Sequence, residues 1–421
     1  MSQALYYFTP SVNSEPFNTN SSKSKGTHKK ASELPYFKVF KKYLIPLGQY
    51  PYQTERSHKI NVTIIVFSTT SLLIPSMLQF FLSMRERDMD TMMECVPIIV
   101  TLLVIMIKIL NHNINRQKFL NIFNRMAELW EISEINGELH VLSEITEEGS
   151  RMGSLYRKSL WGFLVLFVSI PLSSPALDFI APLNETRTKL PLFKLNYIVD
   201  MRDHFYIVYL HSAWCSLIIV LIVTTMDSLY MVIIHYACGL FALCGYQVKK
   251  ATEMVGPKAI PTINTKAQFN RCVITLYEAI RFYEYMDEST RTSYLFQVGL
   301  NMIGITVTAV QAVMYIDRPE EAFRIVMFLL GQQFHLYALS LPGQVLIDRG
   351  LELINDIYFS KWYQIPVKLE KVLHIMQIRC SRPCTLSAGG LYEMNMTNFG
   401  SVCITILPWQ YDYYTTTVNI E

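Results

Sequence analysis

The chain has 421 residues, of which 51% are hydrophobic and only 17% are charged, whereas an ordinary soluble domain has about 25% charged residues. Its formal net charge is only +3, so there is no electrostatic case for a nucleic-acid partner. With a mean hydropathy of +0.23, the composition excludes an ordinary soluble domain and indicates a protein embedded in a lipid membrane.

The N-terminal segment, residues 1–33, is polar and rich in Ser, Asn and Lys. Such a composition cannot bury enough apolar surface to offset the entropy of ordering, so we expect this segment to be disordered and cytosolic. No secretory signal is recognisable ahead of the first apolar run, which begins near residue 60. That run is therefore expected to serve as an uncleaved insertion signal.

Seven apolar runs follow, each close to the roughly 20 residues that a helix needs to cross the bilayer. Lys108 interrupts the second run, and Glu393, Asn395 and Asn398 interrupt the seventh. The sequence therefore predicts an all-α protein with seven transmembrane helices. The predicted spans are 62–82, 95–110, 160–182, 205–226, 295–316, 322–346 and 386–407.

The distribution of positive charge favours one orientation. If the N-terminus is inside, most Lys and Arg residues fall in the inner segments 1–59, 111–158, 246–293 and 347–385. The positive-inside rule then predicts a cytosolic N-terminus and an extracellular C-terminus. A glycosylation sequon at Asn184 lies in the longest outer loop of this arrangement, so we expect Asn184 to be glycosylated.

The fourth apolar run does not end where a membrane span should end. After Asp227 the chain stays apolar through Gly245, with no Pro, and no Gly before Gly239. The extra length is either an eighth span or an extension of the fourth. One continuous helix over 205–245 is the simpler interpretation, and it would be about 60 Å long, twice the lipid core.

Two further segments have the spacing of amphipathic helices, one after the second span and one before the fifth. Their apolar faces predict that the extended helices pack together as a helical domain in the cytosol. The residues on these faces are Phe119, Ile122, Phe123, Met126, Leu129 and Trp130 in the first, and Phe269, Cys272, Val273, Leu276, Tyr277 and Ile280 in the second.

Catalysis has no support in the sequence. The chain contains no GxGxxG, GxxxxGK[ST], HExxH or GxSxG motif, so we expect neither an enzyme nor a cofactor. Cys380 and Cys384 are one helical turn apart but lack the additional ligands of a metal site. We interpret them as reduced cytosolic thiols.

Polar residues recur along one side of the predicted fifth span. The favoured interpretation is hydrogen bonding between helices, and the alternatives are a wet cavity or a subunit contact. His335, in the sixth span, has no acidic residue nearby in the sequence, so a proton relay is not expected there. The stripe consists of Gln297, Asn301, Thr308 and Gln311.

Aromatic residues gather in the predicted outer halves of the third, fourth and sixth spans. We expect at least half of them to be packing residues or part of the aromatic belt at the membrane interface. The others are candidates to line an apolar pocket for a small volatile apolar ligand. The candidates are Phe163, Phe167, Tyr206, Tyr209, Trp214 and Phe328.

The segment between the sixth and seventh spans carries a recognisable pattern. It has a Y-x-S-x-W-Y run, a spaced Lys, an R-x-x-x-P and an L-x-A-G, and it resembles the C-terminal signature of insect odorant receptors. Asp227-Ser228-Leu229, the chain length and the large second outer loop are also similar to that family. The signature residues are Tyr358, Ser360, Trp362, Tyr363, Lys368, Arg379, Pro383, Leu386, Ala388 and Gly389.

The resemblance implies an odorant-binding tuning subunit of a heteromeric ligand-gated cation channel. Such a subunit sits in the plasma membrane of a sensory neuron dendrite, as a multi-pass protein, and forms a heterotetramer with the shared olfactory coreceptor. The resemblance divides the chain after residue 33 into six transmembrane helices with cytosolic extensions (34–356), a cytosolic anchor helix (357–385) and a seventh, pore segment (386–421). The alternative is a gustatory-type homomeric channel.

The resemblance also implies roles for particular residues. Tyr358, Trp362 and Tyr363 would belong to the anchor that holds subunits together, and Val402 and Ile406 would line the pore. The chain departs from the family where Pro408 and a polar tail replace an unbroken apolar helix. Because proline lacks a backbone donor, we expect the pore helix to end there.

Overall fold

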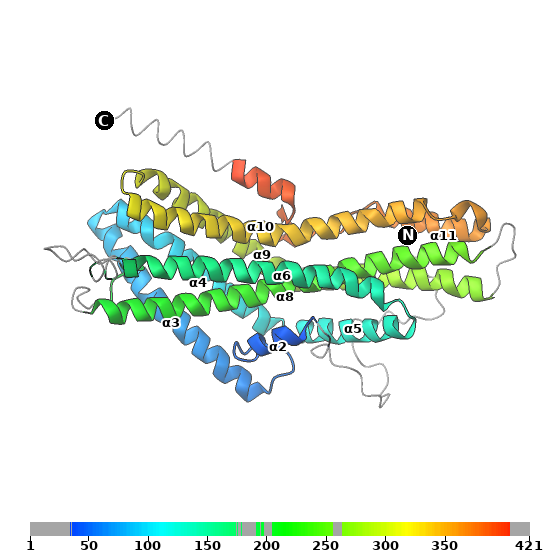
Figure 1. Cartoon of the computed structure of the whole chain (residues 1–421), viewed down its shortest axis with the longest axis horizontal. Helices are drawn as coiled ribbons and strands as arrows, with labels where there is room; N and C mark the ends of the chain where they lie inside the picture. The colour runs from blue at the N-terminus through cyan, green and yellow to red at the C-terminus, as the bar shows by residue number, and fades with distance from the viewer. Residues whose placement is uncertain are drawn as a thin grey trace.

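The computed structural model describes residues 34, 36–173, 175, 178, 191–193, 195–197, 204–255 and 263–404, and the side chain of Glu320 is not among them. Helices account for nearly all of this structure (Figure 1). The elements are α2 (Lys38–Leu44), α3 (Glu55–Glu86), α4 (Met89–Ile114), α5 (Arg116–Ile135), α6 (Leu139–Ser169), η2 (Ile170–Leu172), α8 (Phe205–Glu253), α9 (Ile263–Met314), α10 (Pro319–Tyr358), η3 (Trp362–Gln364), α11 (Val367–Cys380), β1 (Ser387–Ala388) and β2 (Tyr392–Glu393).

Six of the described helices are long and apolar enough to cross a membrane, namely α3, α4, α6, α8, α9 and α10. Each overlaps one of the first six predicted spans, and the all-α membrane fold is confirmed. The third span, predicted over 160–182, is covered by α6 and η2 to residue 172. The prediction of one continuous helix beyond Asp227 is also confirmed, since α8 has 49 residues. At 1.5 Å per residue α8 is about 70 Å long, more than twice the lipid core, so it must extend out of the membrane.

The core of the molecule surrounds the second half of α8. This half is apolar on all sides, and a helix of that kind must be covered all round by other helices. It packs against α6, α9 and α10, while α5 and α11 lie toward the same end of the molecule (Figure 1). We call this part the distal bundle: residues 229–248 of α8 with α5, α11 and the neighbouring turns of α6, α9 and α10.

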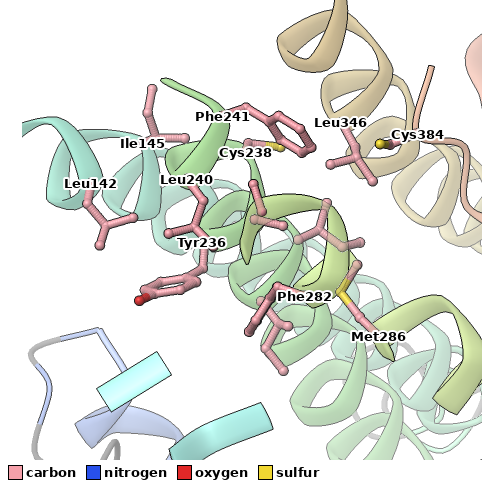
Figure 2. Packing of buried hydrophobic residues seen from close by; sticks show 14 of the residues in the cluster. Leu142, Ile145, Tyr236, Cys238, Leu240, Phe241, Phe282, Met286, Leu346 and Cys384 are labelled. Carbon is pink, nitrogen blue, oxygen red and sulfur yellow. The ribbon is translucent and has the colours of Figure 1, made fainter. Parts of the chain in front are cut away.

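Tyr236 is buried in the distal bundle on the same side as Phe282 of α9, and Met286 lies farther along α9 (Figure 2). Its ring is 5.5 Å from that of Phe282, and its hydroxyl donates a 2.9 Å hydrogen bond to the backbone oxygen of Met126. Met126 belongs to the buried face of α5, as predicted from the amphipathic spacing. The predicted face of the first segment is buried or packed against this core. In the second segment Tyr277 is 44% exposed, while the other predicted face residues are buried or packed against the core.

Small residues let α6 approach α8 closely. A Cβ atom on Gly149 would lie 2.5 Å from the side chain of His235, and one on Gly153 would lie 2.9 Å from that of Ser228. Two glycines four residues apart form the small-xxx-small pattern that brings helices into contact in membranes. This close contact fixes the position of α6 along the middle of α8.

The seventh predicted span begins differently from the expectation. Residues 387–393 form a two-stranded antiparallel hairpin in place of a helix, with Ala388 opposite Tyr392. Gly389 and Gly390 occupy the left-handed region, at φ +65° and +77°, where residues with a side chain are disfavoured. The helix begins only at residue 396 and is described to residue 404.

The hairpin is held against α9 by hydrogen bonds at three successive turns. The Tyr283 hydroxyl donates to the Thr385 carbonyl at 2.7 Å, the Asp287 carboxylate accepts from the backbone N–H of Ser387 at 2.9 Å, and the Arg291 carbonyl accepts from that of Gly389 at 3.0 Å. Leu386, Ala388 and Gly389 of the signature therefore lie in a fixed turn, and their spacing follows from this attachment.

Several predictions fall on residues outside the described part of the chain. They concern the N-terminal segment 1–33, the glycosylation site Asn184, the pore residue Ile406 and the tail after Pro408. They stay predictions from sequence.

Candidate functional site: an apolar cavity between the membrane helices

A cavity of about 180 Å³ lies among the membrane helices on the side of Asp227 away from the distal bundle. The helices α3, α4, α6, α8, α9 and α10 each contribute to its wall, which is predominantly apolar. An enclosed apolar cavity of about 150 Å³ is large enough to bind benzene. The site can therefore accept a small, largely apolar molecule.

Three of the six predicted aromatic residues line this cavity: Phe163 and Phe167 from α6, and Phe328 from α10. The rings of Phe167 and Phe328 are 6.0 Å apart, and that of Phe167 is 5.7 Å from Phe193 in the preceding loop. Three rings from separate parts of the chain therefore meet at one end of the cavity.

The other three predicted aromatic residues lie elsewhere. Tyr206 and Trp214 are on the outward face of α8, 55% and 57% exposed, and do not line the cavity. Tyr209 is buried, but it stacks on Phe205 and its hydroxyl donates to the carbonyl of Val168 at 2.9 Å. Because α8 is apolar on all sides here, its sequence does not reveal which face meets the cavity. The residues of α8 that do line it are Ser216, Ile219, Val220 and Val223.

A smaller cavity of about 50 Å³ adjoins the first, and Phe167, Phe193 and Phe328 line both. Glu94 and Arg324 also line it, with 3.7 Å between their charged atoms. The cluster of Phe167, Phe193 and Phe328 therefore separates the main cavity from this ion pair, which lies near the N-terminal ends of α4 and α10.

At the opposite side of the main cavity, His335 leads to a buried charged network. Its Nδ1 is 2.7 Å from the Tyr156 hydroxyl, which donates a 3.0 Å hydrogen bond to Asp227. Asp227 also forms a buried ion pair with Lys108. No acidic residue is near His335 in the sequence, but in the structure its Nδ1 is 3.5 Å from Asp227. The absence of a proton relay stays a prediction. The two residues are adjacent in space although they are far apart in the sequence.

A signal for this network was present in the sequence. Lys108 and Asp227 are ionisable residues in or next to apolar runs, and a charge placed in a membrane helix needs a partner. The sequence does not show how α4 and α8 are aligned, so it could not pair the two residues.

The polar stripe of α9 does not hydrogen-bond to other helices within the described part of the chain. Thr308 donates to the carbonyl of Gly304 at 2.7 Å and Gln297 donates to Ser293 at 2.5 Å, both within α9. The side-chain nitrogens of Asn301 and Gln311 are buried without a partner. The favoured interpretation, hydrogen bonding between helices, is therefore wrong for these residues. Asn301 lines the main cavity, and Thr308 and Gln311 line the smaller one described above.

A family model described as 7tm Odorant receptor matches residues 88–406, most of the chain. The chain belongs to this family. Two solved structures of the olfactory receptor OR5 from the insect Machilis hrabei, one with eugenol and one without, share its fold. Their TM-scores are 0.67 and 0.66, each at 11% sequence identity and covering 91% of this chain and 98% of the other. No curated protein matches the chain.

The residues that the odorant receptor resemblance assigns to the anchor lie around η3, between α10 and α11. Tyr358 and Tyr363 are largely exposed, and Trp362 packs edge-on against Tyr363 at 6.1 Å. Phe359, which the sequence analysis did not single out, is also exposed, 5.5 Å from Tyr358. These side chains form an aromatic surface patch on the single chain.

In the seventh segment, the described helix lies against α10. The ring of Phe399 is 5.6 Å from that of Tyr337, and Cys403 contacts Gln333 at 3.4 Å. Val402 is half-buried on the same short helix. A pore contact by Val402 stays a prediction.

The two thiols near α11 have a simple environment. Burial raises the pKa of Cys380 to about 12 and that of Cys384 to about 11, so both are protonated near neutral pH. A protonated thiol is a poor nucleophile and a poor metal ligand. These cysteines act as small apolar residues of the distal bundle.

Proposed function

We propose that the chain is the odorant-binding tuning subunit of a heteromeric ligand-gated cation channel. The observation that carries the proposal is the apolar cavity of about 180 Å³ among six membrane helices. Phe167 and Phe328 close one end and His335 connects the other to the buried ion pair. A small volatile apolar ligand would bind there, and eugenol in one of the similar structures is a ligand of comparable kind.

The proposed partner is the shared olfactory coreceptor, in a heterotetramer in the plasma membrane of sensory neuron dendrites. The exposed aromatic patch of Tyr358, Phe359 and Tyr363 supports a subunit contact, because aromatic residues are enriched in the cores of protein interfaces. We propose that this patch belongs to the cytosolic anchor, as the resemblance to odorant receptors implies.

Co-expression tests the proposal. Cells that express the chain with the coreceptor should give an odorant-evoked cation current, whereas the chain alone should give none. The coreceptor alone is the control for currents that do not need this chain. A robust current from the chain alone would favour the gustatory-type homomeric channel instead.

The proposed orientation has its own test at Asn184. With the N-terminus in the cytosol, the loop that contains Asn184 is extracellular and passes through the compartment where glycans are added. Glycosidase treatment should increase the gel mobility of the wild-type chain and leave Asn184→Gln unchanged. The N-terminal segment contains another sequon, Asn20-Ser21-Ser22, and a glycan on Asn20 instead would require the opposite orientation.

A further inference from the structure

Two amide side chains in the main cavity each have one buried atom without a hydrogen-bond partner among the described residues. Asn301 of α9 and Gln332 of α10 both line the cavity and are only 8% and 9% exposed. The side-chain nitrogen of Asn301 and the side-chain oxygen of Gln332 are fully buried and unpartnered within the described part of the chain. Buried polar groups in proteins are nearly always hydrogen-bonded, so this pair needs an explanation.

The other polar side chains of the cavity wall differ from these two. The hydroxyl of Thr101 donates to the carbonyl of Pro97 at 2.8 Å, and that of Ser216 donates to the carbonyl of Ser212 at 2.8 Å. His335 is bonded to Tyr156. The unmet hydrogen-bonding capacity is therefore concentrated in the two amides.

The helices that carry the two amides pack against each other, and Gln332 reaches α9 beside Gly304. The side-chain nitrogen of Gln332 is 3.1 Å from the position that a Cβ on Gly304 would take. Gly304 is three residues after Asn301 on α9, and residues at that spacing are neighbours on one helix face, about 5–6 Å apart. The absence of a side chain at Gly304 leaves the room that Gln332 occupies.

We infer that Asn301 and Gln332 form a polar subsite that binds the single oxygen-containing group of an otherwise apolar ligand. This inference rests on the proposed function and specifies the ligand class of the same cavity. An alcohol fits the pair best, since its hydroxyl accepts from the Asn301 nitrogen and donates to the Gln332 oxygen. A carbonyl oxygen can only accept, so a carbonyl compound pairs with the Asn301 nitrogen alone, and a hydrocarbon pairs with neither amide. Potency should therefore fall from alcohol to carbonyl compound to hydrocarbon.

The test uses matched ligands: benzyl alcohol, benzaldehyde and toluene, and 1-hexanol, hexanal and hexane. The variants are Asn301→Leu and Gln332→Met, which keep size but remove the amide, on two different helices. Thr306→Val is the control, because Thr306 is on the exposed face of α9, does not line the cavity, and its hydroxyl is already bonded to the Met302 carbonyl. Binding is read as ligand-induced thermal stabilisation of the purified chain, and potency as the half-maximal concentration for current with the coreceptor.

Wild type should prefer each alcohol to its hydrocarbon by about tenfold or more. Either amide variant should reduce the alcohol's potency by about tenfold while the hydrocarbon's potency stays constant or improves. Thr306→Val should keep the wild-type preference. Equal affinity of wild type for alcohol and hydrocarbon, as expected if water occupies the amides, would overturn the inference, as would an unchanged preference in both variants.

The two readouts separate this inference from the proposed function. Alcohol-selective thermal stabilisation that disappears in Asn301→Leu, without any current in the presence of the coreceptor, would uphold the subsite and contradict the channel role. Ligand-evoked currents that are equally strong for alcohols and hydrocarbons would uphold the channel role and contradict the subsite.

Discussion

The two halves of α8 are packed in opposite ways. Residues 229–248 are covered by other helices on almost every side, and their core includes the fully buried Tyr236. The first half, by contrast, has an exposed outer face and borders a cavity of about 180 Å³ on its inner face. Because close packing stabilises a fold whereas a cavity forfeits contacts, we expect the second half of α8 to contribute most to stability, while the proposed ligand site borders the first half.

Asp227 lies at the boundary between these halves. Its carboxylate joins Lys108 of α4, Tyr156 of α6 and His335 of α10, and His335 also lines the main cavity. Removing either partner of a buried ion pair is costly, because the remaining charge is left uncompensated in an apolar surrounding. The network therefore connects the cavity to the densely packed bundle.

The largest expected effect is the loss of Tyr236. In Tyr236→Ala, the missing ring leaves a void between α5, α8 and α9 that the bundle cannot fill, at a cost of about 3–5 kcal/mol in the free energy of unfolding. We expect a strong loss of monodisperse protein in size-exclusion chromatography and a much lower melting temperature.

The matched control keeps the ring. Tyr236→Phe loses only the hydrogen bond to the Met126 carbonyl and should cost about 1–2 kcal/mol. If Tyr236→Ala were as stable as wild type, the distal bundle would not be the main source of stability and the contrast between the two halves would fail.

The second-largest effect should come from the buried ion pair of Lys108 and Asp227, at the boundary between the two halves of α8. Lys108→Met leaves the Asp227 carboxylate buried without its cation, so we expect a loss of about 3 kcal/mol in the free energy of unfolding. Lys108→Met combined with Asp227→Asn removes both charges and should recover most of that loss. Thermal unfolding of both single variants and the double variant gives the coupling energy. A double variant with the summed loss of the two single ones would show that the charges are not coupled.

The sequence predicted the features that depend on local pattern. The apolar runs, the continuous α8 and the amphipathic face of α5 follow from periodicity along the chain. The contacts of His335, and the faces that Trp214 and Tyr209 present, depend on how helices rotate and slide against one another. An all-round apolar helix gives no sequence signal for that rotation, so only three of six cavity candidates line the cavity.

The hairpin at the start of the seventh segment is a second feature that the sequence alone could not predict. The run from residue 386 is apolar enough to suggest a helix, but Gly389 and Gly390 adopt φ values of +65° and +77° that end helical geometry. The reason lies in α9, whose Asp287 and Arg291 provide hydrogen-bond acceptors for the turn. These partners are distant in sequence, so the pattern of the segment alone could not indicate them.

A smaller effect should distinguish residues that line the cavity from residues on the outward face of α8. Phe167→Ala removes a ring that lines the cavity and contacts Phe328, so the potency of an active odorant should change about fivefold, equivalent to about 1 kcal/mol. Trp214→Ala is the control on the outward face of α8 and should leave the dose–response curve unchanged. The opposite pattern would place the ligand against Trp214 and outside this cavity.

We propose that a ligand acts in the cavity while the distal bundle provides most of the stability. Gly331→Leu tests both parts of this proposal. Gly331 lines the cavity on α10, and a Cβ there meets no atom within 4 Å. The added side chain should occupy the space of the ligand, while the change from glycine in a helix interior favours the fold by up to about 1 kcal/mol. The measurement is odorant-evoked current with the coreceptor, normalised to surface protein, alongside the melting temperature. We expect the current to be lost at an unchanged or higher melting temperature; a wild-type dose–response curve in this variant would contradict the claim.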